Sequence, residues 1–204
     1  LQLSNLSYPV LDIIPALKEK LSNQTTVILQ APPGAGKSTI LPLELLHEPW
    51  LQDKKIIMLE PRRLAARSVA MRMANLLDEE AGQTIGYRVR FENKISAKTR
   101  IEVVTEGILT RMIQSDNALE GVAMVIFDEF HERSLQADLA LALTVQVQSV
   151  LRSDLRVLVM SATLESEILS EKLKAPVLTS SGRQYPVNMI HTPIDKDTRL
   201  ASAV

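Results

Sequence analysis

The sequence predicts an α/β fold in which a mostly parallel sheet carries helices on both faces. Short apolar or β-rich segments alternate along the chain with segments whose apolar residues recur at helical spacing. One of the apolar segments, residues 122–127, contains no polar residue, as expected of a parallel strand that is buried on both faces. Polar clusters directly follow several of the predicted strands, which is where open α/β sheets bind ligands.

The individual elements follow from the same patterns. An amphipathic helix is expected at residues 9–21, where Val10, Ile14, Leu17 and Leu21 share one face. Strands are expected at residues 25–30, 55–59, 100–104, 122–127, 156–160 and 176–179, and further helices at residues 38–47, 64–77, 107–114 and 135–150. The composition changes near residue 188, so we expect one domain over residues 1–187. Residues 188–204 are then a linker or the start of a truncated second domain.

Composition excludes several classes of protein. Of the 204 residues, 46% are hydrophobic and 3% aromatic, which argues against disorder and against an aromatic platform for stacking bases. The net charge is −1, so any nucleic-acid contact must come from a local patch. The chain has no cysteine, and its most apolar windows contain polar residues. We therefore expect a cytoplasmic protein without disulfides or a membrane span.

A glycine-rich turn lies between the first predicted strand and the second predicted helix. Small residues there let backbone N–H groups close around a phosphate, Lys37 would reach the β- and γ-phosphates, and the Ser38 hydroxyl would bind Mg²⁺. The first glycine of the usual pattern is replaced by Ala31. The alternative is a strand-to-helix turn that binds nothing. The predicted nucleotide-binding residues are Pro33, Gly34, Ala35, Gly36, Lys37, Ser38 and Thr39.

Two carboxylates and a histidine follow the apolar strand at residues 122–127. Asp128 would hold Mg²⁺, and Glu129 would orient and deprotonate an attacking water. His131 is placed to sense the γ-phosphate. A solvated strand end is the alternative, but the phosphate-binding turn upstream favours the catalytic interpretation.

Positive charge gathers in two segments of this nearly neutral chain. Arg62, Arg63, Arg67 and Arg72 follow the second strand, and a further group lies at residues 88–100. Thr105 would cap a helix whose N-terminal amides could hold another phosphate. Because glutamates are interspersed, a salt-bridged surface is the alternative to a nucleic-acid interface.

Together these motifs resemble those of superfamily 2 helicases, and within them the DEAH-box group. The resemblance extends over about residues 10–187. Phe130 stands where most members carry alanine. This residue and the segments at residues 31–39 and 181–187 are most similar to the HrpB branch of bacterial members. The matching segments are residues 31–39, 60–66, 105–111, 128–131 and 161–163, with a further similar stretch at residues 86–91.

The resemblance implies a RecA-like domain that uses ATP or another NTP with Mg²⁺ and acts on RNA, with single-stranded DNA as a second candidate. It also implies backbone contacts from Arg62 and Thr105, a contact near a base from Arg72, and coupling roles for Ser161 and Thr163. A second RecA-like domain supplies an arginine motif in this group, and that motif is not found in this sequence. We therefore expect the chain to bind nucleotide but to hydrolyse it slowly.

Two other classes stay open at this point. The first is a P-loop enzyme that transfers phosphate to a small acceptor, and the segments at residues 128–131 and 161–163 argue against it. The second is a nucleic-acid-binding or protein-binding module that has lost catalysis, and the presence of Lys37 and Glu129 argues against that.

Overall fold

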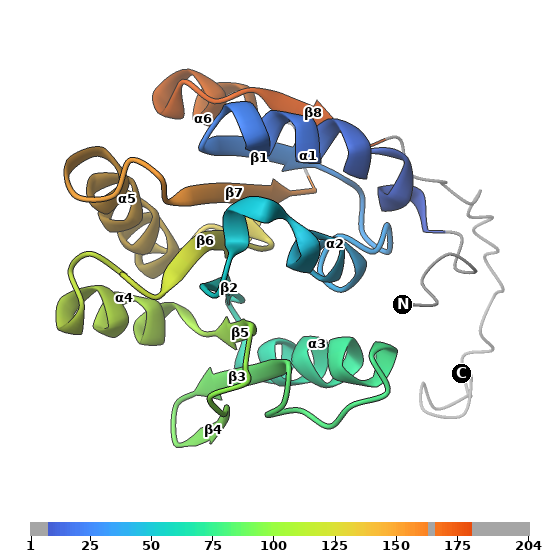
Figure 1. Cartoon of the computed structure of the whole chain (residues 1–204). Helices are drawn as coiled ribbons and strands as arrows, with labels where there is room; N and C mark the ends of the chain where they lie inside the picture. Colours follow the sequence, from blue (N-terminus) through green and yellow to red (C-terminus); the bar gives the residue numbers. More distant parts are fainter. Residues whose placement is uncertain (1–7, 163–165, 181–204) are drawn as a thin grey trace, which may run out of the picture.

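A computed structural model describes residues 8–162 and 166–180 of the chain. In these residues, eight strands form one sheet in the order β4-β3-β5-β2-β6-β7-β1-β8 (Figure 1). Neighbouring strands are parallel except for β3 and β4, so the predicted mostly parallel sheet is confirmed. The strands are β1 Thr26–Gln30, β2 Lys55–Leu59, β3 Ile85–Val89, β4 Glu92–Lys94, β5 Ile101–Val104, β6 Val122–Phe127, β7 Arg156–Ser161 and β8 Val177–Thr179.

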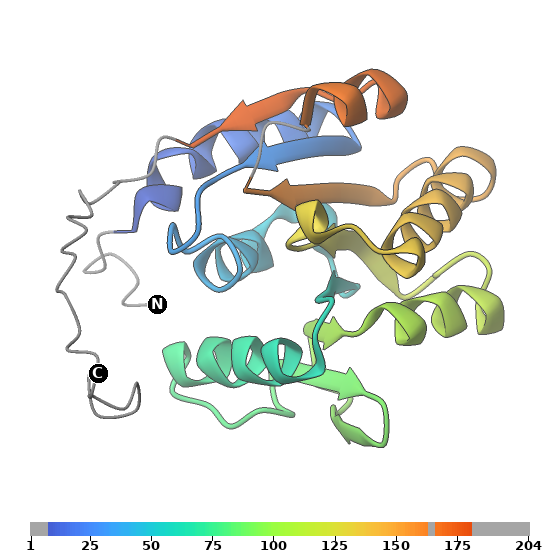
Figure 2. The ribbon, with the colours of Figure 1, turned by 180° about the vertical axis from the view of Figure 1, so that it is seen from behind.

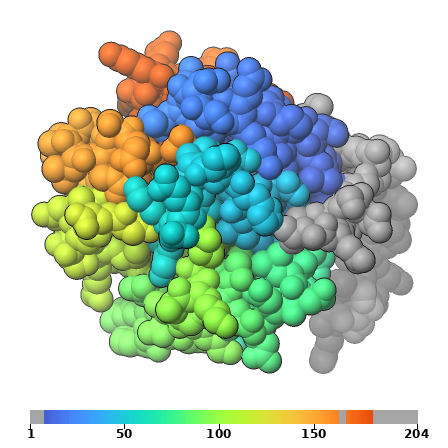
Figure 3. Space-filling view, viewed as in Figure 1, coloured from blue at the N-terminus to red at the C-terminus, as the bar shows by residue number. Residues whose placement is uncertain are grey.

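Helices cover both faces of the sheet, as Figures 1 and 2 show from opposite sides. One face carries α1 (Ile14–Asn23), α2 (Ile40–Glu44) and α3 (Arg63–Leu76). Figure 3 shows α2 near the middle of this face and α1 at the top, towards the β1–β8 end of the sheet. The opposite face carries α4 (Glu106–Ser115), α5 (Leu135–Val150) and α6 (Ser166–Leu173). The described residues also contain four short 3₁₀ helices: η2 Pro9–Asp12, η3 Leu45–His47, η4 Pro49–Leu51 and η5 Phe130–Glu132.

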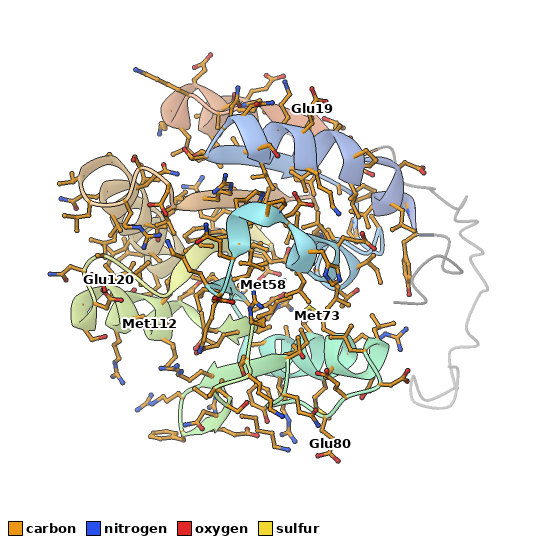
Figure 4. The ribbon with its side chains drawn as sticks, viewed as in Figure 1. Glu19, Met58, Met73, Glu80, Met112 and Glu120 are labelled. Atoms are coloured by element: carbon orange, nitrogen blue, oxygen red, sulfur yellow. The ribbon has the colours of Figure 1, made fainter. Side chains whose placement is uncertain are left out.

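The hydrophobic core consists of two layers, one on each side of the sheet. All six residues of β6 are buried, because this strand lies near the middle of the sheet with helices on both sides. Met58 of β2 and Met73 of α3 belong to one layer, whereas Glu19, Glu80 and Glu120 lie on the outside (Figure 4). This packing fixes the ends of the central strands, where the polar motifs begin.

Three strands or α-helices were not predicted from the sequence, and two predicted helices begin later than expected. The helix expected at residues 9–21 begins at Ile14 and is preceded by the 3₁₀ helix η2. The strands β3 and β4 form a hairpin at one edge, and a Cβ on Gly86 would lie 2.5 Å from the Lys94 carbonyl oxygen, so glycine permits their close approach. The third element is α6, which has only eight residues. The helix expected at residues 38–47 begins at Ile40 and continues from Leu45 as a 3₁₀ turn.

The boundary predicted near residue 188 lies outside the described residues. None of the helices in residues 8–162 and 166–180 combines the length and the apolarity that a membrane span requires.

Candidate functional site

The predicted motifs meet along one edge of the sheet. Parallel strands end at the same edge, and the order β5-β2-β6-β7-β1 places the loops after these five strands side by side. From one side to the other, these loops carry Thr105, Arg62, Asp128, Ala162 and Gly34. Segments that are far apart in the sequence therefore form one continuous polar edge.

The glycine-rich turn begins directly after β1 and is anchored at both ends. The Ala31 N–H donates to the Ser161 carbonyl at 3.0 Å, and the Val10 N–H donates to the Ala35 carbonyl at 3.0 Å. Gly34 and Gly36 have φ angles of +76° and +91°, a region that disfavours side chains. The turn thus has the open backbone that a phosphate-binding loop requires.

Lys37 connects this turn to the end of β6. Its Nζ lies 2.8 Å from Glu129 Oε1, and its side chain is only 3% exposed. The other carboxylate oxygen, Oε2, lies 3.4 Å from His131 Nδ1. The Ala162 N–H donates to the same Nδ1 at 3.3 Å, which requires the histidine to carry a lone pair there. Lys37, Glu129, His131 and Ala162 thus form one chain of contacts between β1, β6 and β7.

Asp128 is buried beside a second carboxyl group. Burial raises the pKa of Asp128, whereas contacts with Glu60 and with the Ser38 hydroxyl oppose that shift. Burial, followed by the charge of Asp128 and the hydrogen bond with it, raises the pKa of Glu60 to about 9. Two buried carboxyl groups in contact cannot both ionise without a large cost, so a proton is retained on the Glu60–Asp128 pair at neutral pH.

The residues present fit a magnesium ion. The Oδ2 atom of Asp128 is buried and has no hydrogen-bond partner of good geometry among the described residues. The Oδ1 atom accepts the Glu129 N–H at 2.9 Å, which orients the carboxylate. The Ser38 hydroxyl lies against the same carboxylate. A carboxylate oxygen without a partner beside a hydroxyl is the oxygen donor set that Mg²⁺ prefers.

The backbone turns sharply where the acidic motif leaves β6. Glu129 adopts a left-handed conformation, with φ 47° and ψ 36°, and Arg133 also has a positive φ of 45°. The single turn of η5 lies between them. Side-chain-bearing residues rarely adopt positive φ, and such residues often cluster at functional sites.

The structure separates the four residues predicted to contact nucleic acid into two groups. Arg62 and Arg63 stand exposed at the start of α3, and Thr105 precedes α4 at the end of the neighbouring β5. Thr105 is the N-cap residue, but its side chain makes no capping hydrogen bond in the described part of the chain. Arg72 is exposed about two and a half turns further along α3, away from that edge.

Of the two predicted coupling residues, one is described. Ser161 is buried at the end of β7, where it is in register with Gln30 of β1. Thr163 lies outside the described residues.

Sequence reasoning missed Glu60, Glu132 and Ser134. Glu60 directly follows β2, just as Asp128 directly follows β6, and these two strands pair in parallel. Glu132 forms an ion pair with Arg62, and the Ser134 hydroxyl donates to Glu106 Oε1 at 2.7 Å. The position of Glu60 at a strand end was a usable signal, whereas the other two contacts depend on the order of the strands.

Two cavities flank η5. A small one of about 170 Å³ is lined by residues that include Pro61, Glu106, Asp128 and Glu129, and so lies between the acidic motif and the predicted nucleic-acid loops. A larger one of about 640 Å³ lies between α5 and α6 and is lined mainly by apolar side chains. The larger cavity is not lined by Asp128 or Glu129, whereas the small cavity is lined by both.

Comparison with known families and structures agrees with this arrangement. A family model described as DEAD/DEAH box helicase matches residues 12–170. A crystal structure of the Escherichia coli DEAH/RHA helicase HrpB superposes with a TM-score of 0.88 at 55% sequence identity, covering 97% of this chain and 25% of that one.

Proteins with similar sequences are also named as RNA helicases. The ATP-dependent RNA helicase HrpB of Escherichia coli is 55% identical over 199 residues, which are 97% of this chain and 24% of the relative. The ATP-dependent RNA helicase HrpA homolog of Haemophilus influenzae is 38% identical over 189 residues, or 92% of this chain and 14% of the relative. The chain thus spans about a quarter or less of the length of these relatives.

Proposed function

Because the chain belongs to the DEAD/DEAH box helicase family, we propose that it is the first RecA-like domain of an ATP-dependent RNA helicase. In this proposal NTP hydrolysis drives translocation on RNA or unwinding of it. The observation that carries the proposal is the contact between Lys37 and Glu129 beside buried Asp128, at the edge where the predicted nucleic-acid loops also end. A phosphate-binding lysine, a metal-binding carboxylate and a candidate base together suit water attack on a phosphoanhydride.

The proposed reaction is hydrolysis of the bond between the β- and γ-phosphates. Glu129 orients a water and accepts its proton while the water oxygen attacks the γ-phosphorus. The bond from that phosphorus to the bridging oxygen breaks, which leaves ADP and inorganic phosphate. Lys37 neutralises the charge that develops on the phosphates, since its buried ammonium has little competing water.

Ser38 and Asp128 are the residues that would hold Mg²⁺. When bound, the ion would neutralise phosphate charge and help to fix the orientation of the nucleotide. The partnerless Oδ2 of Asp128 supports this assignment, and Glu60 supports Asp128 from the neighbouring strand. His131 would report the state of the γ-phosphate to the end of β7 through its contact with Ala162.

A nucleic-acid surface would lie next to this site. Arg62, Arg63 and Thr105 are exposed or half-exposed at the ends of β2 and β5, and would contact phosphates of the backbone. Arg72 would contact the strand separately, further along α3. Contacts to the phosphodiester backbone carry little base-sequence information, so this surface would show low sequence preference. Single-stranded DNA as a second ligand and a cytoplasmic location remain predictions.

The remaining part of the reaction would require a second domain. We propose that residues 1–187 form one domain and that residues 188–204 lead towards a second RecA-like domain, which supplies an arginine to the transition state. Such an arginine accounts for roughly 10³–10⁵ in rate in other NTPases. The isolated chain should therefore bind nucleotide and hydrolyse it very slowly.

The experiment that tests the proposal measures phosphate release from ATP by the chain and by a protein extended to the length of its relatives. Each is assayed with and without single-stranded RNA. The proposal predicts RNA-stimulated release by the extended protein alone. Consumption of ATP that RNA does not change, with the γ-phosphate recovered on a small acceptor and not as free phosphate, would instead indicate a phosphotransferase.

A further inference from the structure

The turn that carries Glu129 and His131 is tied at two points to the loops proposed to bind nucleic acid. Glu132, the last residue of η5, forms an ion pair with the guanidinium of Arg62 at the start of α3. Two residues later, the Ser134 hydroxyl donates to Glu106 Oε1 at 2.7 Å, in the first turn of α4. The loop after β6 is therefore in direct contact with the loops after both β2 and β5.

Backbone conformations that side-chain-bearing residues rarely adopt flank this turn on both sides. Left-handed or otherwise positive φ angles occur at Glu129 and at Arg133, which flank η5 on either side. Beyond them, the Ser134 side chain accepts the Ala137 N–H at 2.9 Å and so caps α5. Strained residues at both ends of one short turn persist only where surrounding contacts hold them, and the Arg62–Glu132 pair is one such contact.

The ion pair of Glu132 with Arg62 lies beside the acidic motif, because Glu132 lines the same small cavity as Asp128 and Glu129. Arg62, whose side chain is 70% exposed, neutralises Glu132 from the solvent side. A nucleic-acid phosphate that bound Arg62 would compete with Glu132 for the same guanidinium. Glu132 would then lie beside Asp128 and Glu129 without its counterion.

We infer that Glu132 is a positioning residue which couples the nucleic-acid surface to the nucleotide site by exchanging its ion pair with Arg62 for a phosphate–Arg62 contact. The exchange links the two sites through one turn, because Glu132 and Glu129 flank the same η5 segment. The inference rests on the proposed function, since it requires that Arg62 contact nucleic acid. It adds a residue that touches neither nucleotide nor RNA.

The test is a double-mutant cycle on RNA affinity. Fluorescence anisotropy of a labelled single-stranded RNA measures binding to the wild-type chain, Glu132→Gln, Arg62→Gln and the double variant. Glu132→Gln should bind RNA about two- to fivefold more tightly than the wild type, because Arg62 loses its intramolecular competitor. That gain should disappear when Arg62 is also replaced.

Asp138→Asn is the matched control. It removes the same charge and breaks another exposed ion pair close by in sequence, with Arg133 at 2.8 Å, but leaves Arg62 and Glu132 paired. Its effect on RNA affinity measures the general electrostatic gain from losing one negative charge. The increase in RNA affinity caused by Glu132→Gln must exceed the increase caused by Asp138→Asn. Thermal unfolding of each variant verifies that the fold is retained.

A second readout follows affinity for a fluorescent, non-hydrolysable Mg·ATP analogue with and without saturating RNA. Binding coupling is reciprocal, so RNA should change this affinity in the wild type and in Asp138→Asn but not in Glu132→Gln. Equal behaviour of Glu132→Gln and Asp138→Asn in both readouts would overturn the inference and leave the proposed function intact. If neither the chain nor a protein extended to the length of its relatives bound RNA, the proposed function would be overturned, and this inference with it.

Discussion

The Nζ atom of Lys37 lies 2.8 Å from Oε1 of Glu129, so the proposed phosphate-binding lysine and the proposed base share one ion pair. Lys37 follows the glycine-rich turn after β1, whereas Glu129 leaves β6 in a left-handed conformation. Nucleotide phosphates would compete with Glu129 for the same ammonium. Nucleotide binding would therefore release the Glu129 carboxylate to act on water.

Replacing Lys37 with alanine should weaken binding of Mg·ATP by about 10- to 100-fold, because charge-assisted hydrogen bonds to the phosphates are lost. Isothermal titration calorimetry on the chain measures the effect. Lys54→Ala is the matched control, since Lys54 is a partly exposed lysine whose partner is Asp154 at 3.1 Å. Equal affinities of the two variants would place the nucleotide elsewhere.

Replacing both Arg62 and Arg63 with glutamine should weaken binding of single-stranded RNA and reduce its dependence on salt. Each lost phosphate contact lowers the slope of log affinity against log salt concentration by about 0.7 for single strands. Anisotropy titrations at several salt concentrations give this slope. Lys18→Gln is the control, because Lys18 pairs with Glu44 and Glu48 away from the predicted surface. If the control lowers the slope as much, the predicted surface is wrong.

Replacing Glu60 with glutamine should stabilise the chain at alkaline pH and flatten its pH dependence. The pKa of Glu60 is raised in the fold to about 9, above its ordinary value of 4.5. The protonated form is thus favoured by folding, and its contribution to stability is complete below pH 4.5 and is lost as pH rises towards 9. Glutamine mimics the protonated form at every pH. We expect a gain of roughly 1–3 kcal/mol at pH 8.

Urea unfolding between pH 5 and pH 9 measures this difference, with Glu19→Gln as a control on an exposed glutamate of α1. The wild type and the control should lose stability over this range, whereas Glu60→Gln should lose less. Parallel curves for all three proteins would show that Glu60 ionises in the fold as it does in water.

Replacing Gly36 with alanine should destabilise the chain more than replacing Gly34. Both glycines have positive φ, so both substitutions incur backbone strain of about 1–2 kcal/mol. A Cβ on Gly36 would also lie 3.2 Å from the Tyr8 side chain, whereas a Cβ on Gly34 would meet nothing within 4 Å. Thermal unfolding of the two variants gives the comparison. An equal loss of stability in the two variants would mean that the Tyr8 side chain can move away from the new methyl group without cost.

Much of the fold follows from local pattern, and the exceptions have physical causes. The strands β2 and β6 and the helix α5 have the predicted bounds, because their hydrophobic patterns are uninterrupted and each packs into the core. The hairpin of β3 and β4 was not predicted. Gly86 and Arg88 interrupt the apolar pattern of β3, and β4 consists of three polar residues at the sheet edge.

The site was predictable to the extent that strand ends determine it. Lys37, Asp128 and Glu129 follow β1 and β6, and a parallel sheet brings such residues to one edge whatever the strand order. Glu60 directly follows β2, so the same rule places it at this edge, but it does not reveal the contact of Glu60 with Asp128. That contact, and the contact of Glu132 with Arg62, require β2 and β6 to be neighbours, although β3, β4 and β5 lie between them in the sequence.

The most direct test of the account compares wild type and Glu129→Gln in a protein extended to the length of its relatives. Affinity for Mg·ATP, affinity for single-stranded RNA and RNA-stimulated phosphate release are measured on both. We expect the variant to bind Mg·ATP at least as tightly as the wild type, because Lys37 loses a competing carboxylate, and to keep its affinity for RNA. Phosphate release should be about 10²–10⁴-fold slower, because the proton acceptor has been removed. Phosphate release by Glu129→Gln at the rate of the wild type would contradict the account, since Glu129 would then have no role in the reaction.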